Sequence, residues 1–359
     1  MAYRNLVAEN LTPGATSEAE WFMRMRDFVC KRNATYDYST TGIGWTLYDW
    51  SYAVNENNAA INDWIVLYSA GELGVDKMYY KITLIQDYIT IWGYQSWNSS
   101  TNTGVGAYYR DNAMQIGADP EQIYIYGDLD FVHLVAVGVA ANTNWYCGAF
   151  GMLETNYLIP LEGVDTPRNV QICSTSLTAG SAVSIVVPNS SSNLWRVGNS
   201  IIIMDDTYLE KITVITNDGA GTITANLTNS YSAGSKICVS FPYFVAGQNT
   251  TNFYRSGYCV FLHDLMGNHA GGVQEAATIA VITNATYFNL NLPAGWNQAF
   301  AIQPYGVYDA TYGYIGNIPT SGYIIGTGLA NYDLLDDVTA SGVQWRYVST
   351  TNPRVYKEV

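Results

Sequence analysis

Apolar side chains recur along this chain with two different periods. Near the N-terminus, residues 17–20 (SEAE) have the composition of a capping box, in which Ser17 and Glu20 each satisfy a free backbone N–H. Apolar residues follow at the spacing of one helix face: Trp21, Phe22, Met25, Phe28 and Val29. The pattern predicts a single amphipathic helix near the start of the chain.

Basic residues gather in the later turns of this predicted helix, at Arg24, Arg26, Lys31 and Arg32. Cations near a helix C-terminus complement the helix dipole, and a basic cluster in an acidic protein also suits an acidic neighbour. Both interpretations stay open at this stage. The second predicts a docking helix that presents Trp21, Arg24, Met25, Arg26 and Phe28 to a partner.

After Asn33 the period changes to that of β-strands. Short runs rich in Val, Ile, Tyr and Trp are separated by Gly, Asn, Asp and Ser. Between Asp87 and Trp97 the side chains alternate, with Tyr88, Thr90, Trp92 and Tyr94 on one face and Ile89, Ile91 and Gly93 on the other. Because both faces carry hydrophobic bulk, we expect a mainly β protein with an antiparallel β-sandwich or jelly-roll-like domain.

Breaks in the strand pattern divide the chain. The stretch LEGVDTPR near residues 161–168 interrupts the strands with Pro and charge, and short strands at roughly ten-residue spacing follow. We therefore expect four parts: an N-terminal arm and helix (1–33), a β-sandwich (34–165), a small β-barrel-like module (166–245) and a C-terminal β domain (246–359).

The amino-acid composition indicates what surrounds this protein rather than how it folds. Charged residues are only 13% of the chain, Tyr alone numbers 30, and the formal net charge is −14. A surface of hydroxyls, amides and rings is common where a protein meets other subunits, although an ordinary β-rich secreted protein is the alternative. Because the chain has few Lys and Arg, we exclude nucleic acid as a partner.

The N-terminus lacks a signal peptide and no window approaches 18 apolar residues, so we expect neither Sec export nor a membrane span. Five widely spaced cysteines favour buried, reduced thiols.

Candidate chemistry is sparse. A metal could be held by His263, Asp264 and His269, but their spacing matches no known motif, and a core histidine followed by a turn is favoured. On a strand, Asp128 and Asp130 would face one side as an acid–base or calcium pair, whereas in a turn they would cap backbone N–H groups, which we favour. The same holds for Asp205, Asp206, Asp333, Asp336 and Asp337. We predict no catalytic residue, metal or cofactor.

Three stretches resemble structural proteins of tailed bacteriophages and prophages. They are GYQSWNSSTNTGVGAYY (93–109) with YIYGDLDFVHLVAV downstream, VGNSIIIMDDTYLEKITVITNDGAGTITANLTNSYSAGSKI, and GNIPTSGYIIGTGLANYDLLDDVTASGVQWRYVST. The resemblance implies a virion component made in the host cytoplasm. Its partners would be other virion proteins and copies of itself, in a closed ring.

Two functions compete for the first stretch. One is assembly in a tail or baseplate, with a capsid or neck decoration role as a variant. The other is recognition of a host glycan, with rings that stack on sugars and amides that bind hydroxyls. Both use the same residues: Trp92, Tyr94, Gln95, Trp97, Asn98, Asn102, Tyr108 and Tyr109. Strand alternation sets Trp97 opposite Trp92 and Tyr94, which weakens a flat sugar platform and favours assembly. A β-helical depolymerase would show a repeat period in its sequence, and this chain shows none.

Overall fold

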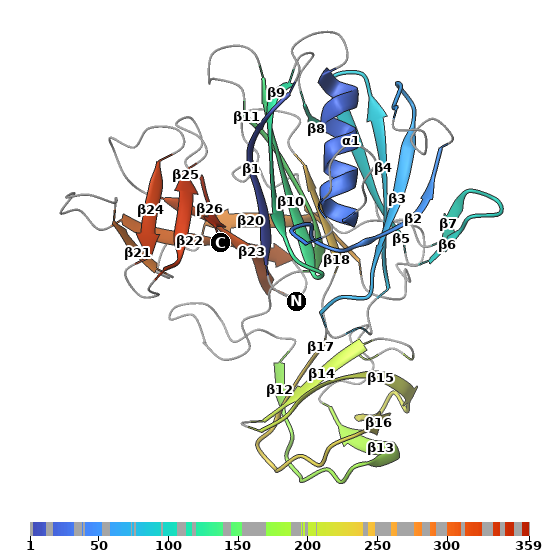
Figure 1. The fold of residues 1–359 in the computed structure, drawn as a ribbon. Coiled ribbons are helices and arrows are strands. Elements are labelled where there is room, and N and C mark those ends of the chain that lie inside the picture. Colours follow the sequence, from blue (N-terminus) through green and yellow to red (C-terminus); the bar gives the residue numbers. More distant parts are fainter. Residues whose placement is uncertain are drawn as a thin grey trace.

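The computed structural model is mainly β, with one helix among the residues that it describes (Figure 1). These are residues 3–11, 17–31, 38, 40–51, 58–72, 74, 77–94, 96–105, 113–116, 120–138, 145–152, 170–187, 195, 197, 200–205, 207–239, 243–247, 260–263, 276–281, 288–291, 300–309, 313–324, 333–337, 342–347 and 354–358. Every strand pairing among them is antiparallel, as the predicted sandwich requires. The prediction of a β-rich fold is confirmed.

A sandwich of two sheets forms the body of the molecule. The first sheet has the order β2-β3-β4-β5-β8, and its strands are β2 (Thr46–Trp50), β3 (Trp64–Ser69), β4 (Met78–Ile85), β5 (Tyr88–Tyr94) and β8 (Ala113–Gln115). The second begins with β1 (Arg4–Asn10), β9 (Pro120–Gly127), β10 (Phe131–Gly138), β11 (Trp145–Met152) and β18 (Tyr243–Gly247). One hydrophobic core draws residues from both sheets.

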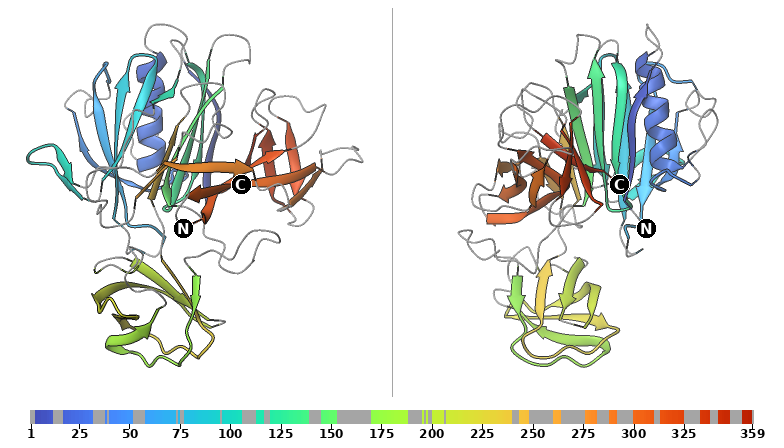
Figure 2. Two further views of the ribbon diagram at one scale, coloured as in Figure 1. Left: turned by 180° about the vertical axis from the view of Figure 1, so that it is seen from behind. Right: turned by 60° about the vertical axis from the view of Figure 1, so that its left-hand side comes forward.

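Helix α1 (Ser17–Cys30) lies between these two sheets (Figures 1 and 2). The predicted helix is therefore confirmed, but its surroundings are not those of an exposed docking surface. The five residues proposed for docking are all buried: Trp21, Arg24, Met25, Arg26 and Phe28.

The basic side chains of α1 are neutralised locally instead of facing a partner. Arg24 pairs with Glu20 one turn earlier at 2.5 Å, and Arg26 pairs with the adjacent Asp27 at 2.5 Å. A buried cation is costly unless it is paired, so these ion pairs allow the helix to sit inside the sandwich. The docking-helix prediction is corrected on this ground.

The N-terminal segment is part of the sandwich and not an arm. Strand β1 pairs with β9, with Arg4 opposite Gly127 and Asn10 opposite Gln122. Strand β1 has only seven residues of mixed polarity (RNLVAEN), which do not show the alternation typical of a strand. The sequence pattern therefore did not reveal it.

Residues 170–239 form a module that is inserted into the second sheet. Its own sheet has the order β12-β17-β14-β15-β16-β13, from β12 (Val170–Ile172), β13 (Gly180–Val186), β14 (Ser200–Met204), β15 (Leu209–Asn217), β16 (Thr222–Leu227) and β17 (Lys236–Val239). The strands surround a separate core that includes Trp195, Ile201 and Ile223. Strands β11 and β18, which flank the insertion in the chain, pair directly with each other. The module hangs apart from the two sheets of the body (Figures 1 and 2).

The C-terminal third continues the second sheet. Its strands are β19 (Val260–His263), β20 (Ala276–Val281), β21 (Phe288–Asn291), β22 (Phe300–Asp309), β23 (Gly313–Ile324), β24 (Leu334–Asp337), β25 (Gln344–Tyr347) and β26 (Arg354–Glu358). Since β18 pairs with β19, the body and the C-terminal region share one 13-stranded sheet.

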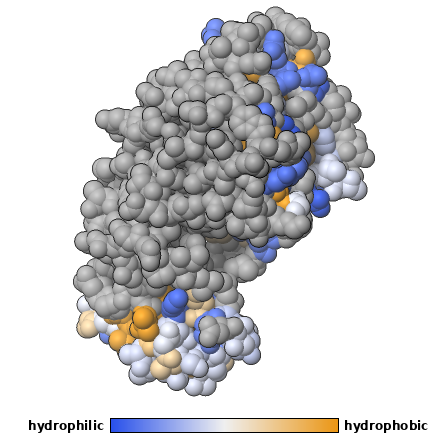
Figure 3. All heavy atoms as spheres, turned by 90° about the vertical axis from the view of Figure 1, so that its left-hand side faces the viewer, coloured by the Kyte–Doolittle hydropathy of each residue, from blue (hydrophilic) through white to orange (hydrophobic). Residues whose placement is uncertain are grey.

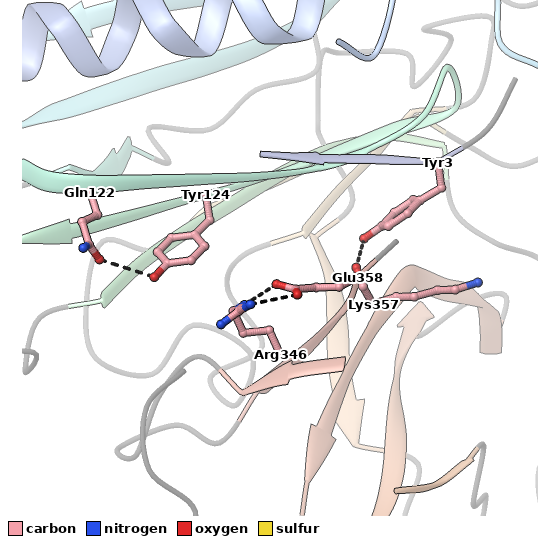
Figure 4. Close-up of polar contacts among 6 residues, drawn as sticks. All are labelled: Tyr3, Gln122, Tyr124, Arg346, Lys357 and Glu358. Carbon is pink, nitrogen blue, oxygen red and sulfur yellow. Dashed lines mark hydrogen bonds and ion pairs between the residues drawn. The ribbon is translucent and has the colours of Figure 1, made fainter. Parts of the chain in front are cut away.

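The end of the chain packs against the start of the sandwich (Figure 4). Tyr3 Oη donates to the carbonyl of Lys357 at 2.6 Å, and Arg346 of β25 forms an ion pair with Glu358 of β26. The rings of Tyr126 and Tyr356 stack at 5.0 Å between these two parts. Among the described residues, no helix is long and apolar enough to cross a membrane.

Candidate interaction face

Most of the solvent-accessible aromatic side chains of the five-stranded sheet lie on its outer face. Alternate residues of β3, β4 and β5 point into the core, including Ile65, Tyr80 and Ile91. Outward-pointing neighbours on these strands are half-buried: Trp64, Tyr68, Tyr79, Lys81 and Trp92. Together with the exposed Tyr48 of β2 and the buried Tyr94 and Trp97, they form what we call the aromatic face.

The rings of the aromatic face form a connected array. Tyr79 lies 4.8 Å from Tyr68 and 5.1 Å from Tyr48, measured between ring centroids. In a second group, Trp97 lies 5.3 Å from Tyr94 and 5.8 Å from Trp64. Tyr79 and Tyr94 face each other across β4 and β5, so the two groups meet. Tilted and edge-to-face pairs of this kind each add to the stability of the face beyond their buried area.

One cation lies at the centre of this array. Lys81 Nζ sits 4.6 Å from the ring centroid of Trp64 and 5.5 Å from that of Trp97. Burial lowers the pKa of Lys81, while the nearby Asp49 carboxylate raises it. Asp49 Oδ2 in turn accepts a 2.6 Å hydrogen bond from Trp97 Nε1. The positive charge of Lys81 is therefore stabilised by the rings of Trp64 and Trp97 and by the carboxylate of Asp49.

Two tyrosine hydroxyls of the face, those of Tyr79 and Tyr94, stay protonated at neutral pH. Burial, together with the neighbouring Tyr48 and Tyr68, raises the pKa of Tyr79 to about 12. Burial also raises the pKa of Tyr94. At neutral pH these groups are hydrogen-bond donors and acceptors without charge.

A short hairpin is anchored on the same face. It consists of β6 (Ser96–Asn98) and β7 (Thr103–Val105), and it projects from the fold (Figures 1 and 2). Trp97 anchors β6, and Gly104 of β7 lies flat against the ring of Tyr94. A Cβ at Gly104 would come within 2.0 Å of that ring, so only glycine fits.

The tip of the hairpin is polar and exposed. Asn98 Oδ1 accepts from the backbone N–H of Ser100 at 3.0 Å, and Asn102 adopts a positive φ of 52° that closes the turn. Asn98 and Asn102 both face solvent. The two short strands of the hairpin are therefore joined by a polar turn.

The structure changes two predictions about residues 93–109: the face on which Trp97 lies and the set of rings that could stack on a sugar. Trp97 was expected opposite Trp92 and Tyr94, yet it packs in the same cluster. The reason is that β5 ends at Tyr94 and a separate strand begins at Ser96, so the alternation does not continue. Tyr94 and Trp97 are also buried, at 8% and 6% exposure, which removes them as sugar-stacking rings. Gln95, Tyr108 and Tyr109 lie outside the described residues.

Several members of the aromatic face were missed by sequence reasoning: Tyr48, Trp64, Tyr68, Tyr79 and Lys81. The signal was present, since WIVLYS and MYYKITLI alternate between core and outward residues. What the sequence lacks is the register, which places Tyr68 opposite Tyr79.

The acidic pair of the GDLDF stretch lies in the turn between β9 and β10, as favoured above. Asp128 Oδ1 accepts from the N–H groups of Asp130 and Phe131, at 2.8 and 3.2 Å. Asp130 Oδ1 accepts from the N–H of Glu72 at 2.7 Å. Burial raises the pKa of Asp128 to about 7 despite these hydrogen bonds, and burial also raises that of Asp130. The Asp128 carboxylate therefore caps the turn itself, and the Asp130 carboxylate ties the turn to the loop after β3.

Other candidate carboxylates serve similar local roles. Asp205 caps the N–H groups of Thr207 and Tyr208, and Asp336 accepts from Gln344 Nε2 at 2.9 Å. Asp206, Asp264 and His269 lie outside the described residues, and so does the side chain of His263. Within the described part of the chain, no group of three His, Cys, Asp or Glu residues could hold a metal ion. Cys147 and Cys173 are buried, and burial raises the pKa of Cys173 to about 11, which makes it a poor nucleophile at neutral pH.

Comparison with known proteins adds no family to this geometry. A scan against protein-family models finds no match, and a search of curated proteins finds no significant relative.

Proposed function

We propose that this chain is a non-enzymatic structural component of a tailed-phage virion, which assembles with neighbouring subunits through its aromatic face. The observation that carries the proposal is the connected array of half-buried rings on the outer face of the five-stranded sheet. Tyr and Trp are enriched at protein interfaces, while Lys and Glu are depleted there. The face matches that composition, with Lys81 partly buried among the rings.

Three further observations support assembly. The hydroxyls of Tyr79 and Tyr94 are uncharged at neutral pH, and the carboxylate of Asp49 already accepts a hydrogen bond from Trp97, so a partner can cover the face at little desolvation cost. The polar hairpin projects beside it and extends the contact surface. The low charge of the whole chain agrees with a particle in which much of the surface is covered.

The resemblance to phage structural proteins supplies the kind of assembly. It favours a tail or baseplate position, with capsid or neck decoration as the alternative. Recognition of a host glycan at the aromatic face is less favoured, because Tyr94 and Trp97 are buried and Trp92 stacks parallel to Tyr94, with an interplanar angle of 10°. A sugar needs a ring face that is open to solvent.

The proposal is tested by placing a charge within the aromatic face. Trp92→Asp is compared with Val186→Asp, because Val186 is an exposed residue of the distant module. Each variant would be supplied in trans to a phage that lacks its own copy of the chain. We expect Trp92→Asp to lower incorporation into purified particles by at least about tenfold, since a buried unpaired charge costs several kcal/mol. Val186→Asp should assemble normally.

Two outcomes would contradict the proposal. One is that mass spectrometry of purified wild-type particles lacks the chain. The other is that cryo-electron microscopy places it in the particle with the aromatic face open to solvent. Circular dichroism of each purified variant separates loss of assembly from loss of folding.

A further inference from the structure

His133 lies where the C-terminal strands cover the second sheet. Its neighbours in β10, Val132 and Leu134, belong to the core around α1, so His133 points from the opposite face of the strand. There it meets β23 and β26. Its Nε2 lies 2.7 Å from the carbonyl oxygen of Pro319, and its ring centroid lies 5.2 Å from that of Tyr356. His133 is therefore buried between two regions of the chain.

The contact with Pro319 fixes the state of the imidazole. A carbonyl oxygen can only accept, so Nε2 of the neutral ring carries the proton and Nδ1 carries a lone pair. Nδ1 is buried and has no hydrogen-bond partner among the described residues. A second proton would have to reside on Nδ1, and an unpaired charge in a buried site is costly.

The surroundings of His133 do not compensate a positive charge. Titratable or charged groups approach from the N-terminus, β9, β11, β25 and β26: Tyr3, Tyr126, Cys147, Arg346, Tyr356 and Glu358. Tyr126 lies directly opposite His133, and burial raises its pKa well above the ordinary value, so it is uncharged. The carboxylate of Glu358 is already paired with Arg346.

We propose that acid weakens the contact between the C-terminal strands and the second sheet, and that His133 is the residue whose protonation does so. When β23 and β26 separate from β10, water becomes available to Nδ1, so protonation favours the open arrangement. Opening uncovers an apolar face of the sheet that includes Phe131 and Val135, both buried in the closed arrangement. The device is independent of assembly through the aromatic face.

The direction of the pH dependence follows from burial. Burial lowers the pKa of His133 from 6.5 to about 4, although the hydrogen bond to the carbonyl of Pro319 raises it. A histidine exposed by opening returns to the ordinary value. The closed contact is therefore at full strength above pH 6.5 and weakens as pH falls toward 4.

Thiol labelling of Cys147 on the full chain measures this opening. Cys147 pairs with Val135, so it lies on the same sheet face as His133, and it is buried. A pyridyl disulfide reagent labels thiols in acid as well as at neutral pH, and peptide mass spectrometry reads each cysteine separately. Each rate is divided by that of the same thiol in the urea-unfolded chain at the same pH. We expect this relative rate at Cys147 to rise roughly 30-fold from pH 8 to pH 5, as a pKa change from 6.5 to about 4 requires.

Two variants remove the titrating group. His133→Gln keeps a donor for the carbonyl of Pro319, and His133→Phe keeps a buried ring; neither should show the rise. Asp128→Asn is the matched control, because Asp128 precedes β10 and titrates in the same range, with a pKa of about 7, and this variant should keep the rise. Cys173 of the module core is the internal reference and should show no comparable rise.

Three results would overturn the inference. They are no rise at Cys147 in the wild type, an equal rise in both His133 variants, or a rise at Cys173 as large as that at Cys147, which indicates unfolding of the whole chain. A variant that labels rapidly already at pH 8 has lost the contact itself, and the other variant then decides. If both do so, the ring holds the contact without switching it, and the inference is withdrawn. None of these results bears on particle assembly, which Trp92→Asp tests separately.

Discussion

The sandwich body and the inserted module reach similar β structure by different routes. In the module, every pairing of the described strands stays within residues 170–239, from the hairpin of β14 and β15 to the pairing of its first strand, β12, with its last, β17, and its core is its own. In the body, hairpins such as β3 with β4 occur beside pairings of β1 with β9 and of β11 with β18, which join long stretches of chain. One polypeptide therefore combines a self-contained unit with one that depends on distant contacts.

This difference also concerns the surfaces. The body holds its rings together on one sheet face and buries even the charged residues of its helix. The module leaves apolar side chains exposed on its strands (Figure 3), among them Ile172, Val186 and Ile215. We therefore expect assembly through the aromatic face to depend on the body and not on the module.

The largest expected effect comes from removing one buried tryptophan in each region. Trp45 of the body donates to the carbonyl of Asp128 at 2.8 Å and packs on Phe150, whereas Trp195 lies in the module core. Each change to Ala should cost about 3–5 kcal/mol of unfolding free energy, because it leaves a large cavity. Differential scanning calorimetry should show two unfolding transitions, one for the body and one for the module. Each variant should lower only the melting temperature of the region that carries its substitution. A single transition that both variants lower equally would show that the two regions do not fold independently.

A smaller effect is expected at Gly104, where the hairpin meets the aromatic face. Gly104→Ala places a methyl group against the ring of Tyr94 and should cost roughly 1–3 kcal/mol locally. Limited proteolysis should then cut faster at the turn between β6 and β7. Gly180→Ala is the control, since its new Cβ meets only Val183 at 3.7 Å. Equal proteolysis of both variants and the wild type would mean that the hairpin is not held by this contact.

Carboxylates of the two regions should respond to pH with opposite signs. Because burial raises the pKa of Asp128 from 3.8 to about 7, its contribution to stability is complete below pH 4 and is lost as pH rises through 7. Asp128→Asn should therefore be more stable than the wild type at pH 8, by about 1–3 kcal/mol, and similar to it at pH 4.

The module supplies the contrasting carboxylate. Backbone N–H groups of Thr222 and Ala220 lower the pKa of Asp218, so its contribution is present above its ordinary pKa and is lost as pH falls. Asp218→Asn should lower the stability of the module near neutral pH and leave it unchanged in acid. Urea denaturation followed at several pH values measures both variants. The same sign of pH dependence in both would refute the assignment.

The smallest effect is expected at Glu210 of the module. Burial raises its pKa, but hydrogen bonds from Thr228, Asn229 and Tyr231 outweigh this and lower it. Glu210→Gln keeps acceptors and loses the charge, so we expect a loss of about 0.5–1 kcal/mol in the module transition alone. A loss of this size in the body transition would argue for coupling between the regions.

The sequence predicted the elements better than their environments. The SEAE stretch located the start of α1, although the buried Ser17 hydroxyl has no hydrogen-bond partner among the described residues and does not cap the helix as predicted. The alternation from Tyr88 to Tyr94 located β5 with the correct faces. Arg24 and Arg26, however, suggested either complementarity to the helix dipole or a docking surface for an acidic partner. Their burial depends on ion pairs and on two sheets that close over the helix, which no local pattern contains.

The candidate site was predicted only in part. The hairpin and its polar turn follow from the residues between Ser96 and Val105. The position of Trp97 depended on a break after Tyr94, and the contribution of β2, β3 and β4 depended on register. A shift of one residue in register moves a side chain to the other face of a sheet, so these contacts could not be deduced from periodicity.

Most of the secondary structure follows from the sequence alone: a mainly β chain with one amphipathic helix, short strands and polar turns. These features follow from backbone geometry, because a period of 2 or 3.6 residues sets which side chains share a face. Only the tertiary structure decided what each face meets. It placed α1 inside the sandwich, joined β1 to β9, inserted the module between β11 and β18, and assembled the aromatic face from five strands. These contacts join residues that are distant in the chain, and their energies depend on packing and desolvation, which the local pattern does not encode.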